Sequence, residues 1–387
     1  MTLSNEAAMK RISSAPIAPI PHHKSPPTEP KVFVGRIKKS EKPTIPAIVP
    51  KKPKLTKCVP GIKVLGVGRA NGSKEMPNEA LAKLGYDSDW IVQRTGIKSR
   101  FHLAEGESTS DLAIRASERC IANAEIDPSE IDLIVVATVS PDYKTPSTAC
   151  QIQGHFDIQT SAFDLNAACS GFMYAMVTAS QFVRSGSSHT ALVIGAEAVS
   201  TFVSPEDRKT FPLFGDAAGA VLITSDSNPD PEAASGILAY ELGSDGKLGN
   251  ALCVPAGGSK KPLSQEVLDN GEHFLAMDGR AVFKWAVRLI PQVVGDLLNS
   301  ANMRIEDIDL FIPHQANTRI IDAAVDDLGI DPSKVFVNLD KFGNTSAASI
   351  PVAVTEAMEQ GRIKPGDNVM MIGFGAGLSW GACLYRW

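Results

Sequence analysis

The sequence predicts an α/β fold whose sheets are covered by helices. From about residue 61 onward, short apolar runs alternate with stretches of helical spacing, and alternating β and α elements form sheets with covered faces. Residues 131–139 are a near-continuous apolar run, which is typical of a strand buried on both faces. A similar run recurs later in the same context, and this recurrence is the second observation behind the predicted fold.

The recurrence indicates an internal duplication. Residues 130–139 and 306–315 both place Ile-Asp-Leu before an apolar strand. The elements that follow also match in outline (helix, strand, small-residue helix, strand), and residues 192–196 are matched by residues 369–373. Chance similarity of two buried strands is the alternative, but it does not explain the shared order. The sequence therefore predicts one half-fold that occurs twice.

The first half opens with a predicted strand over residues 62–68 that ends in a glycine turn. Gly66 and Gly68 suggest a dinucleotide-binding turn. We reject that interpretation because Asn71 stands where a third glycine is needed and Pro77 follows where a helix would run. The further elements expected are a helix over 110–123, a strand over 131–139, a helix at about 146–156, a strand at about 161–165, a helix at about 170–185 and a strand at about 190–196.

Composition excludes several classes of protein. The chain has 387 residues, of which 43% are hydrophobic and 21% charged, so it is neither wholly disordered nor collagen-like. A formal net charge of −5 argues against a nucleic-acid partner. No apolar run reaches the ~18 residues that a membrane span needs, so we expect no membrane insertion. The six cysteines form no Cys-x-x-Cys pair, and we expect neither a disulfide framework nor a metal or redox cofactor.

Residues 1–60 differ from the rest of the chain. They hold 12 Lys and Arg against three Glu, a net charge of +9, so the remainder carries −14 and the two sum to −5. With 11 of the 26 prolines and almost nothing to bury, this segment is predicted to be a disordered basic arm. An interaction arm and a targeting segment are the alternatives. We expect a cytoplasmic protein, or a plastid one if the arm is a transit peptide. The predicted halves span residues 61–235 and 236–387.

Cys169 is the first candidate catalytic residue. It lies in Asp-Leu-Asn-Ala-Ala-Cys-Ser-Gly-Phe, where an apolar strand ends at Leu165 and small residues lead into a helix. The positive end of a helix dipole favours a thiolate, and small neighbours let a substrate approach. A buried structural cysteine is the alternative, since most free cysteines are of that kind.

His314 and Asn344 occupy matching positions in the second half. His314 follows an apolar strand in Phe-Ile-Pro-His-Gln-Ala-Asn, at the strand end where ligands bind in α/β sheets. Asn344 lies in Lys-Phe-Gly-Asn-Thr-Ser-Ala-Ala-Ser, and by itself it is as well explained as a helix cap. Together with Cys169, these residues sit at strand-to-helix junctions that a duplicated fold can bring together. The glycine turn over 373–380 ends another apolar strand and can add backbone N–H groups to the same place.

Further motifs occur along the chain, together with the segment around Cys169, at residues 89–97, 146–153, 214–220, 313–317, 343–349 and 373–381. With these motifs, residues from about 61 to 387 resemble β-ketoacyl-[acyl carrier protein] synthase III, the initiating condensing enzyme of bacterial and plastid fatty-acid synthesis. The resemblance implies the thiolase fold, two similar halves stacked as five α-β-α-β-α layers, and a homodimer. The set of Cys169, His314 and Asn344 distinguishes this family from condensing enzymes with Cys-His-His and thiolases with Cys-His-Cys.

The resemblance implies a two-step reaction. Cys169 takes an acyl group from a short acyl-CoA such as acetyl-CoA, and the carbanion formed by decarboxylation of malonyl-ACP attacks that thioester to give a 3-oxoacyl-ACP. His314 and Asn344 donate hydrogen bonds to the malonyl thioester oxygen. The backbone N–H groups of Cys169 and Ala376 form the other oxyanion hole, although the family often has glycine at the second of these positions. Phe374 matches an aromatic residue near the nucleophile.

The family pattern also implies binding residues. Trp90 and Arg208 match the pair that sandwiches the adenine of CoA, Arg94 lies near the phosphates, and Gly279 and Asn317 line the pantetheine tunnel. A core tryptophan and surface salt bridges are the alternative interpretations. Thr145 replaces an aromatic residue that limits the primer pocket in some relatives, which leaves room for a longer or branched primer.

The acidic acyl carrier protein requires a basic docking face. Arg280, Lys284 and Arg288 form one stripe on a predicted helix, and Lys284 and Arg319 match docking positions of the family. A solvated helix face is the alternative interpretation. One departure from the family pattern is a pair of acidic residues, Asp326 and Asp327, at positions where several relatives have two basic residues.

Two other functions stay open at this point. One is a synthase III-like acyltransferase or condensing enzyme of secondary metabolism, with another acceptor or extender. The other is a non-catalytic paralogue that binds CoA or ACP, which the intact set of Cys169, His314 and Asn344 disfavours because a scaffold has no need of all three.

Overall fold

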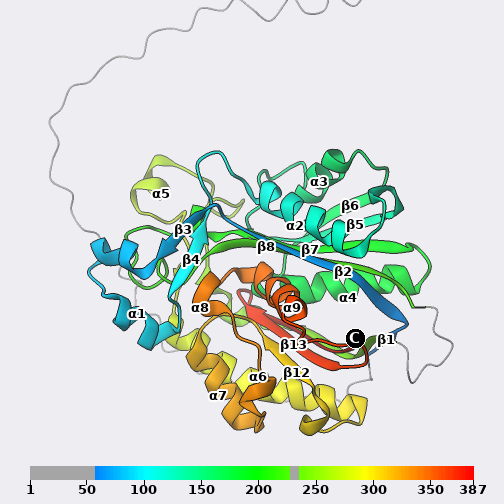
Figure 1. The fold of residues 1–387 in the computed structure, drawn as a ribbon. Coiled ribbons are helices and arrows are strands. Elements are labelled where there is room, and N and C mark those ends of the chain that lie inside the picture. Colours follow the sequence, from blue (N-terminus) through cyan, green and yellow to red (C-terminus); the bar gives the residue numbers. More distant parts are fainter. Residues whose placement is uncertain (1–56, 227–234) are drawn as a thin grey trace, which may run out of the picture. The chain divides into compact units, whose positions relative to one another are not determined.

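The computed structural model describes residues 57–226 and 235–387, and two five-stranded sheets form the centre of this part of the chain (Figure 1). The first sheet has the order β2 (Ile62–Asn71), β8 (Asp216–Ser225), β7 (Thr190–Ala198), β5 (Leu133–Ala137) and β6 (Ser161–Leu165). The second has the order β1 (Val59–Pro60), β9 (Gly236–Ser244), β14 (Ser379–Arg386), β13 (Asn368–Gly375) and β12 (Leu310–Pro313).

The two sheets repeat one topology. In the first, β5 runs parallel to β6 and β7, and β7, β8 and β2 continue as antiparallel neighbours. In the second, β12 runs parallel to β13, and β13, β14 and β9 continue as antiparallel neighbours. A single parallel bridge from Phe311 to Val335 takes the place of β6. The shared order confirms the duplicated fold, and β1 is an addition to the second sheet.

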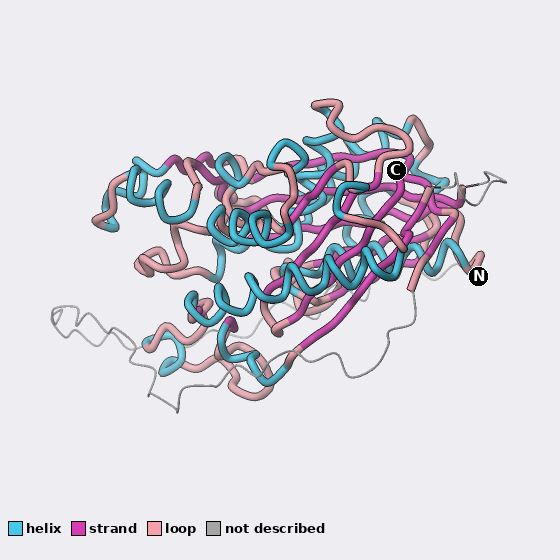
Figure 2. Tube along the Cα trace, turned by 90° about the horizontal axis from the view of Figure 1, so that it is seen from below, coloured by secondary structure: helices cyan, strands magenta, loops and turns pink. Residues whose placement is uncertain are grey.

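Helices complete a five-layer stack (Figure 1). The outer layers are α2 (Thr109–Ala124) with α3 (Thr148–Phe156) on the first sheet, and α6 (Gly279–Ala301) with α7 (Thr318–Leu328) on the second. Between the sheets lie α4 (Gly171–Arg184) and α9 (Ser349–Glu359), which contact strands of both. All residues of α9 from Ser349 to Ala357 are buried, as a helix covered on all sides requires. Figure 2 shows the strands from below, with helices of the lower outer layer in front.

The helices and strands predicted between residues 62 and 196 are present with small shifts at their ends, apart from the glycine turn. β2 does not turn after Gly68 but runs on to Asn71. A Cβ on Gly68 would lie 2.2 Å from the carbonyl oxygen of Ala116, and one on Gly66 would lie 2.6 Å from that of Cys120. These glycines therefore let α2 pack closely on the strand, and they do not form a phosphate-binding turn.

Smaller elements surround the ends of the sheets. The short strands are β3 (Lys74–Pro77), β4 (Ser99–His102), β10 (Leu252–Cys253) and β11 (Ala276–Met277), and the short helices are α1 (Ser88–Thr95), α5 (Gln265–Asp269) and α8 (Leu339–Phe342). Two 3₁₀ turns matter for the site, η3 (Ala168–Ser170) and η8 (Ser346–Ala348). Among the helices of residues 57–226 and 235–387, none is long and apolar enough to cross a membrane.

Most of the predicted arm lies outside the described residues, which begin at Lys57. Its last residues are wrongly assigned to a disordered arm. Val59 and Pro60 form β1, which pairs antiparallel with Ile237 and Gly236 of β9. Val59 is 1% exposed and belongs to the main core cluster. β1 therefore lies before the predicted boundary at Gly61, because Val59 has an apolar core to enter.

Candidate active site

Cys169 sits in a tight turn between the first sheet and the central layer. β6 ends at Leu165, η3 holds the cysteine, and α4 begins at Gly171. The hydroxyl of Ser170 donates to the carbonyl of Ala167 at 2.7 Å and lies 2.9 Å from the hydroxyl of Ser379 on β14. These bonds fix the turn against the second half of the molecule, so the cysteine lies where the halves meet.

β13 of the second sheet approaches this turn without side chains in between. A Cβ on Gly375 would lie 2.7 Å from the Sγ atom of Cys169, and one on Gly373 would lie 2.9 Å from the carbonyl oxygen of the same residue. Real Cβ atoms do not come that close, so the backbone itself is the wall beside the thiol. The glycines of the 373–380 turn thus have a packing role in addition to the predicted one.

His314 follows β12 and is held by its backbone and its ring. Its N–H donates to the carbonyl of Ile372 at 2.8 Å, and its Nδ1 lies 2.6 Å from the hydroxyl of Ser349 at the start of α9. The ring stands edge-on to Phe374, with 5.3 Å between centroids. Complete burial lowers the pKa of His314 to about 3, so the imidazole is neutral at physiological pH. If the Ser349 hydroxyl donates to Nδ1, the ring proton is on Nε2.

Asn344 is fixed through both its backbone and its amide. Its N–H donates to the carbonyl of Leu213 at 2.8 Å, and its Oδ1 accepts a bond from the N–H of Ser346 at 2.9 Å. The side chain is 7% exposed. Because Oδ1 is engaged by a backbone donor, the Nδ2 protons remain to be donated to a ligand.

Ser346 connects these residues across the two halves. Its Oγ lies 3.5 Å from the Sγ atom of Cys169, while its N–H holds Asn344. Phe374, which packs against His314, is adjacent in sequence to Gly375, which packs against Cys169. The structure therefore brings together Cys169, His314 and Asn344, with Phe374 beside them.

The thiol of Cys169 is buried and uncharged at neutral pH. Burial is the main cause that raises its pKa to about 11, and the carboxylate of Glu197 adds to the rise. The hydroxyl of Ser346 lowers this pKa, and the backbone N–H groups of Ala376 and of Cys169 itself act in the same direction to a smaller extent. The N–H groups at the start of the helix act in the direction expected from the sequence, but desolvation outweighs them.

The predicted CoA residues lie at the surface beside α1. Arg208 is 5.5 Å from the ring of Tyr86, that ring stacks on Trp90 with 4.0 Å between centroids, and Arg94 is 5.4 Å from the ring of Trp90. The four side chains form one stack, in the order Arg208, Tyr86, Trp90, Arg94. Trp90 is not a core residue, since 37% of it is exposed. The place between Trp90 and Arg208 is filled by Tyr86, which the sequence did not single out.

The two predicted tunnel residues lie at helix starts. Asn317 caps α7 through its Oδ1, and its Nδ2 donates to the carbonyl of Arg94 at 3.2 Å, so it also supports α1. Gly279 begins α6 and is exposed. Thr145 is exposed on the segment between β5 and α3 and lies outside the buried group around Cys169.

The predicted docking stripe is exposed. Arg280, Lys284 and Arg288 occupy the outer face of α6, and the guanidinium of Arg319 on α7 lies 5.7 Å from the ring centroid of Phe283. The departure from the family pattern lies on the same helix as Arg319. Two exposed acidic residues stand near the end of α7: Asp326 and Asp327.

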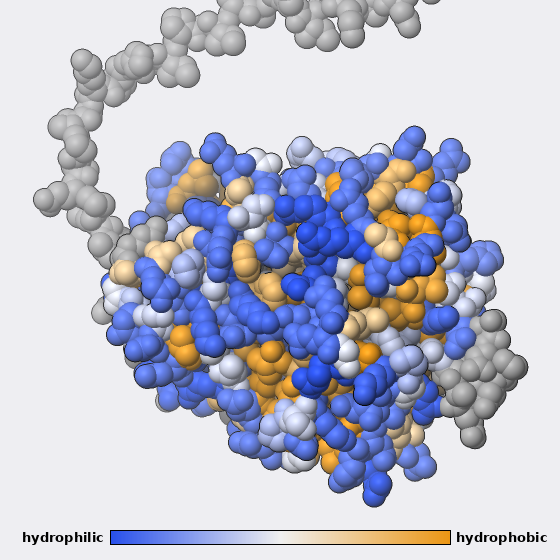
Figure 3. Space-filling model, viewed as in Figure 1, coloured by the Kyte–Doolittle hydropathy of each residue, from blue (hydrophilic) through white to orange (hydrophobic). Residues whose placement is uncertain are grey.

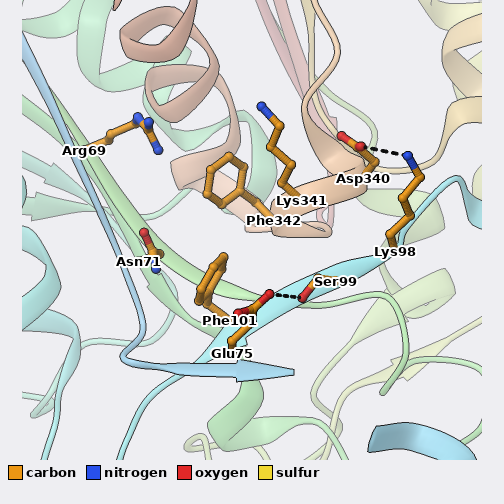
Figure 4. A pocket seen from close by; sticks show the side chains of 9 residues that line it. All are labelled: Arg69, Asn71, Glu75, Lys98, Ser99, Phe101, Asp340, Lys341 and Phe342. Carbon is orange, nitrogen blue, oxygen red and sulfur yellow. Dashed lines mark hydrogen bonds and ion pairs between the residues drawn. The ribbon is translucent and has the colours of Figure 1, made fainter. Parts of the chain in front are cut away.

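An open pocket of about 460 Å³ lies elsewhere on the surface (Figure 4). Its charged side chains are engaged by other protein groups. Lys98 donates to Asp340 at 3.3 Å and Ser99 donates to Glu75 at 3.2 Å, while Arg69 and Lys341 pair with carboxylates outside the pocket. We assign it no part in the reaction. The pocket is lined by Arg69, Asn71, Glu75, Lys98, Ser99, Phe101, Asp340, Lys341 and Phe342.

Known proteins are similar to most of this chain. The family models for 3-oxoacyl-[acyl-carrier-protein] synthase III and for its C-terminal part match residues 163–246 and 298–387. The β-ketoacyl-[acyl-carrier-protein] synthase III of Rhodopirellula baltica is 50% identical, over 84% of this chain and 99% of that protein. The crystal structure of the Aquifex aeolicus synthase III superimposes with a TM-score of 0.77 at 40% identity, over 84% of this chain and 100% of that one. The priming β-ketosynthase of the R1128 polyketide pathway gives a TM-score of 0.76 at 33% identity, over 87% and 99%.

Gly375→Ala tests the packing around the thiol. The added Cβ would overlap the Sγ atom of Cys169, so we expect a loss of about 1–3 kcal/mol of unfolding free energy and slower alkylation of Cys169 by iodoacetamide. Gly295→Ala is the matched control, because it lies within α6 with nothing within 4 Å of its added Cβ, and it is expected to be neutral or stabilising. Urea unfolding and peptide mapping measure both effects, and equal behaviour of the two variants contradicts the packing argument.

Proposed function

The chain belongs to the β-ketoacyl-[acyl-carrier-protein] synthase III family, and from this premise we propose how its residues perform the reaction. It is an acyltransferase that joins a short acyl-CoA primer to malonyl-ACP with loss of CO₂, which gives a 3-oxoacyl-ACP and initiates fatty-acid synthesis. The observation that carries the residue assignment is the buried thiol of Cys169 packed against Gly375 of β13, with Ser346 in contact with both the sulfur and Asn344. Acyl-CoA and malonyl-ACP are substrates, and the proposal assigns the reaction no metal or redox cofactor.

In the first step, the sulfur of Cys169 attacks the thioester carbon of the acyl-CoA. A covalent acyl-enzyme divides one difficult reaction into two easier ones. The negative charge that develops on the thioester oxygen is stabilised by the N–H groups of Cys169 and Ala376, which already approach the sulfur. An alanine serves at position 376 because the backbone, not the side chain, is the donor.

In the second step, His314 and Asn344 act on the malonyl group. Its decarboxylation builds negative charge on the thioester oxygen, and two neutral donors stabilise that charge. His314 is neutral because its pKa is lowered to about 3, and Ser349 at Nδ1 leaves Nε2–H as the donor. Asn344 presents Nδ2 because Oδ1 is held by Ser346. Loss of one such donor typically costs roughly 10²–10³ in rate.

Acyl-CoA approaches along α1. Trp90 offers an exposed ring for the adenine, and Arg94 and Arg208 offer positive charge for the phosphates. The ring of Tyr86 already occupies the stacking position on Trp90. Adenine binding therefore requires this ring to move, and part of the binding free energy is spent on breaking the Tyr86–Trp90 stack.

Acyl carrier protein is assigned to the exposed basic face of α6. Lys284 lies between Arg280 and Arg288 on one stripe, and Arg319 adds a charge from α7. Opposite charges on the two partners steer their encounter. The two exposed aspartates near the end of α7 repel an acidic partner, so the contact is expected on the α6 side of the face.

A condensing enzyme of secondary metabolism remains the second candidate, because the R1128 priming ketosynthase has a similar fold and 33% identity. The chemistry at Cys169 is the same in both cases, and only the acceptor and extender differ. The bacterial origin of the relatives named above favours a cytoplasmic location over a plastid one.

We assign the homodimer contact to β6. This strand is the outer strand of the first sheet and is only partly buried, and Phe163 on it lies 6.3 Å from Phe182 on α4, which is 38% exposed. Figure 3 shows apolar patches that interrupt a largely charged surface, one of them over the region of β2, β5 and β6. An uncovered outer strand with aromatic neighbours is a natural place for a second copy to pair.

Sedimentation equilibrium tests the dimer. We expect twice the mass of the 41.2 kDa chain at micromolar concentration. Replacing Phe163 by Lys places a charge at the contact and should shift the protein to the monomer mass. A monomeric wild-type protein, or a variant that stays dimeric, contradicts the assignment to β6.

Intact-mass analysis tests the function. Incubation with acetyl-, propionyl-, isobutyryl- or longer acyl-CoA, without malonyl-ACP, should add the mass of one acyl group to the wild-type protein and nothing to Cys169→Ala. Malonyl-ACP added afterwards should remove the acyl group and yield a 3-oxoacyl-ACP. If none of these donors gives an adduct, the proposal is overturned. If an adduct forms that another extender removes and malonyl-ACP does not, the second candidate is favoured.

Tyr86→Ala tests the stacked aromatic pair. Such a stack is worth about 0.5–1.5 kcal/mol, so its removal should lower KM for acyl-CoA by about two- to tenfold with kcat nearly unchanged. Trp90→Ala should raise KM instead. Acyl-pantetheine is the control substrate because it lacks the nucleotide, and neither variant should change its KM. A higher KM for acyl-CoA in Tyr86→Ala would show that Tyr86 itself contacts the donor.

A further inference from the structure

Glu197 is a fully buried carboxylate that the mechanism above does not use. It lies near the end of β7, within a strand whose nine residues are all buried, and it is 0% exposed. Its Oε2 accepts bonds from the hydroxyl of Ser140 at 2.6 Å and from the N–H of Val139 at 3.1 Å. Its Oε1 accepts a bond from the hydroxyl of Ser346 at 3.0 Å. Burying a carboxylate costs folding free energy, so a carboxylate beside the nucleophile indicates a functional role.

Ser346 stands between Glu197 and Cys169. Its Oγ is 3.0 Å from Oε1 of the carboxylate and 3.5 Å from the Sγ atom of the thiol. The hydroxyl has one proton, so it donates to only one of the two neighbours at a time. When it donates to Glu197, its oxygen is free to accept the S–H of Cys169. The three groups then form a continuous path for a proton.

The thiol needs a proton acceptor when it reacts. The pKa of Cys169 is raised to about 11, so at neutral pH the sulfur still carries its proton when acyl-CoA arrives. His314 is bonded to Ser349 through Nδ1, and the reaction as proposed keeps a proton on its Nε2 for the malonyl step. Ser346 is the group whose hydroxyl contacts the sulfur.

We propose that Ser346 and Glu197 take up the proton of Cys169 as its sulfur attacks the acyl-CoA. The S–H bond breaks and its proton joins Oγ of Ser346, while the Ser346 proton passes to Oε1 of Glu197. The electron pair left on sulfur forms the bond to the acyl carbon. When the C–S bond to CoA breaks, Glu197 returns a proton through Ser346 to the departing sulfur. The products are the acyl-enzyme, free CoA–SH and the original carboxylate. The summed charge of Cys169, Ser346, Glu197 and the reacting acyl group stays at minus one throughout.

The electrostatics of the pocket suit this role. Burial raises the pKa of Glu197 to about 7, so about half of the carboxylate is ionised at pH 7, and the ionised form is a better proton acceptor than an exposed carboxylate. The groups that contact it from the end of β5 and from η8 are neutral donors, and Cys169 on η3 is the titratable group that faces it. Glu197 touches no reacting atom, so it acts through Ser346.

Glu197→Gln removes the acceptor and keeps the shape. Transfer of the acyl group to Cys169, followed as CoA release in a single turnover, should slow by about 10²–10⁴, the usual contribution of a general base. Alkylation of Cys169 by iodoacetamide should slow as well, because the thiol must also lose its proton in that reaction, while the free energy of unfolding in urea should not fall. A collapsed site would lower the free energy of unfolding, and a purely electrostatic role would speed the alkylation, because a negative charge that opposes the thiolate has been removed.

Three further measurements complete the test. Ser346→Ala should reproduce the slow acyl transfer, since its backbone N–H still holds Asn344, and Glu197→Asp should restore part of the rate. In the wild type the rate should rise as pH increases through about 7, as Glu197 ionises, and this dependence should be absent in Glu197→Gln. Glu356→Gln is the control for loss of a buried carboxylate remote from the sulfur, with 5% exposure and bonds to Asn338 and Lys341.

The inference rests on the proposed function, and the outcomes separate the two. Failure of the wild-type protein to accept any acyl group overturns the function itself. Normal acylation by the wild type together with an equally fast Glu197→Gln variant leaves the function standing and overturns the role of Glu197. Loss of both reactions together with a lower free energy of unfolding in Glu197→Gln also overturns it, because the residue would then be structural.

Discussion

The close approach of the two halves at Cys169 is the constraint on which the site depends. The turn that holds the thiol meets the backbone of β13 at a distance that no side chain tolerates, as Gly375 demonstrates. The turn itself begins at Ala168, whose φ of 47° is uncommon for a residue with a side chain. Ser346, at the matching place of the second half, has a φ of 51°. The duplication therefore supplies two equivalent strained turns, η3 and η8, that contact each other.

From this contact the roles of the two halves diverge. The first turn presents a sulfur atom, and the second presents the amide of Asn344 and the hydroxyl of Ser346. Burial makes each of these groups more sensitive to its neighbours, because hydrogen bonds and charges are not screened by water. Burial lowers the pKa of His314 and raises those of Cys169 and Glu197. One physical cause thus yields a neutral donor, a protonated thiol and a carboxylate able to exchange protons near pH 7.

The sequence was sufficient for the architecture, and the three main site residues that it proposes lie close together in that architecture. Apolar runs and a sequence pattern that occurs twice predict covered, duplicated sheets. The topology of these sheets then brings residues at strand ends together. The glycines of β2 were misread as a turn because their reason lies in another element, the backbone of α2. The stack of Tyr86 on Trp90 could not be predicted from the sequence for a similar reason. It depends on ring geometry at the surface, and only the resemblance pointed to Trp90 and Arg208.

Glu197 could have been identified as a candidate functional residue from the sequence, but it was overlooked. The strand over 190–198 reads Thr-Ala-Leu-Val-Ile-Gly-Ala-Glu-Ala, and a carboxylate inside such an apolar run must be buried with it. Charged side chains are rarely buried unless their surroundings use them. Because β7 and β13 are equivalent strands, the carboxylate also has a predictable location, next to the turns that both halves place at the centre. A lone charge in a continuous buried strand therefore indicates a functional group as directly as a catalytic motif does, provided the fold places that strand beside the site.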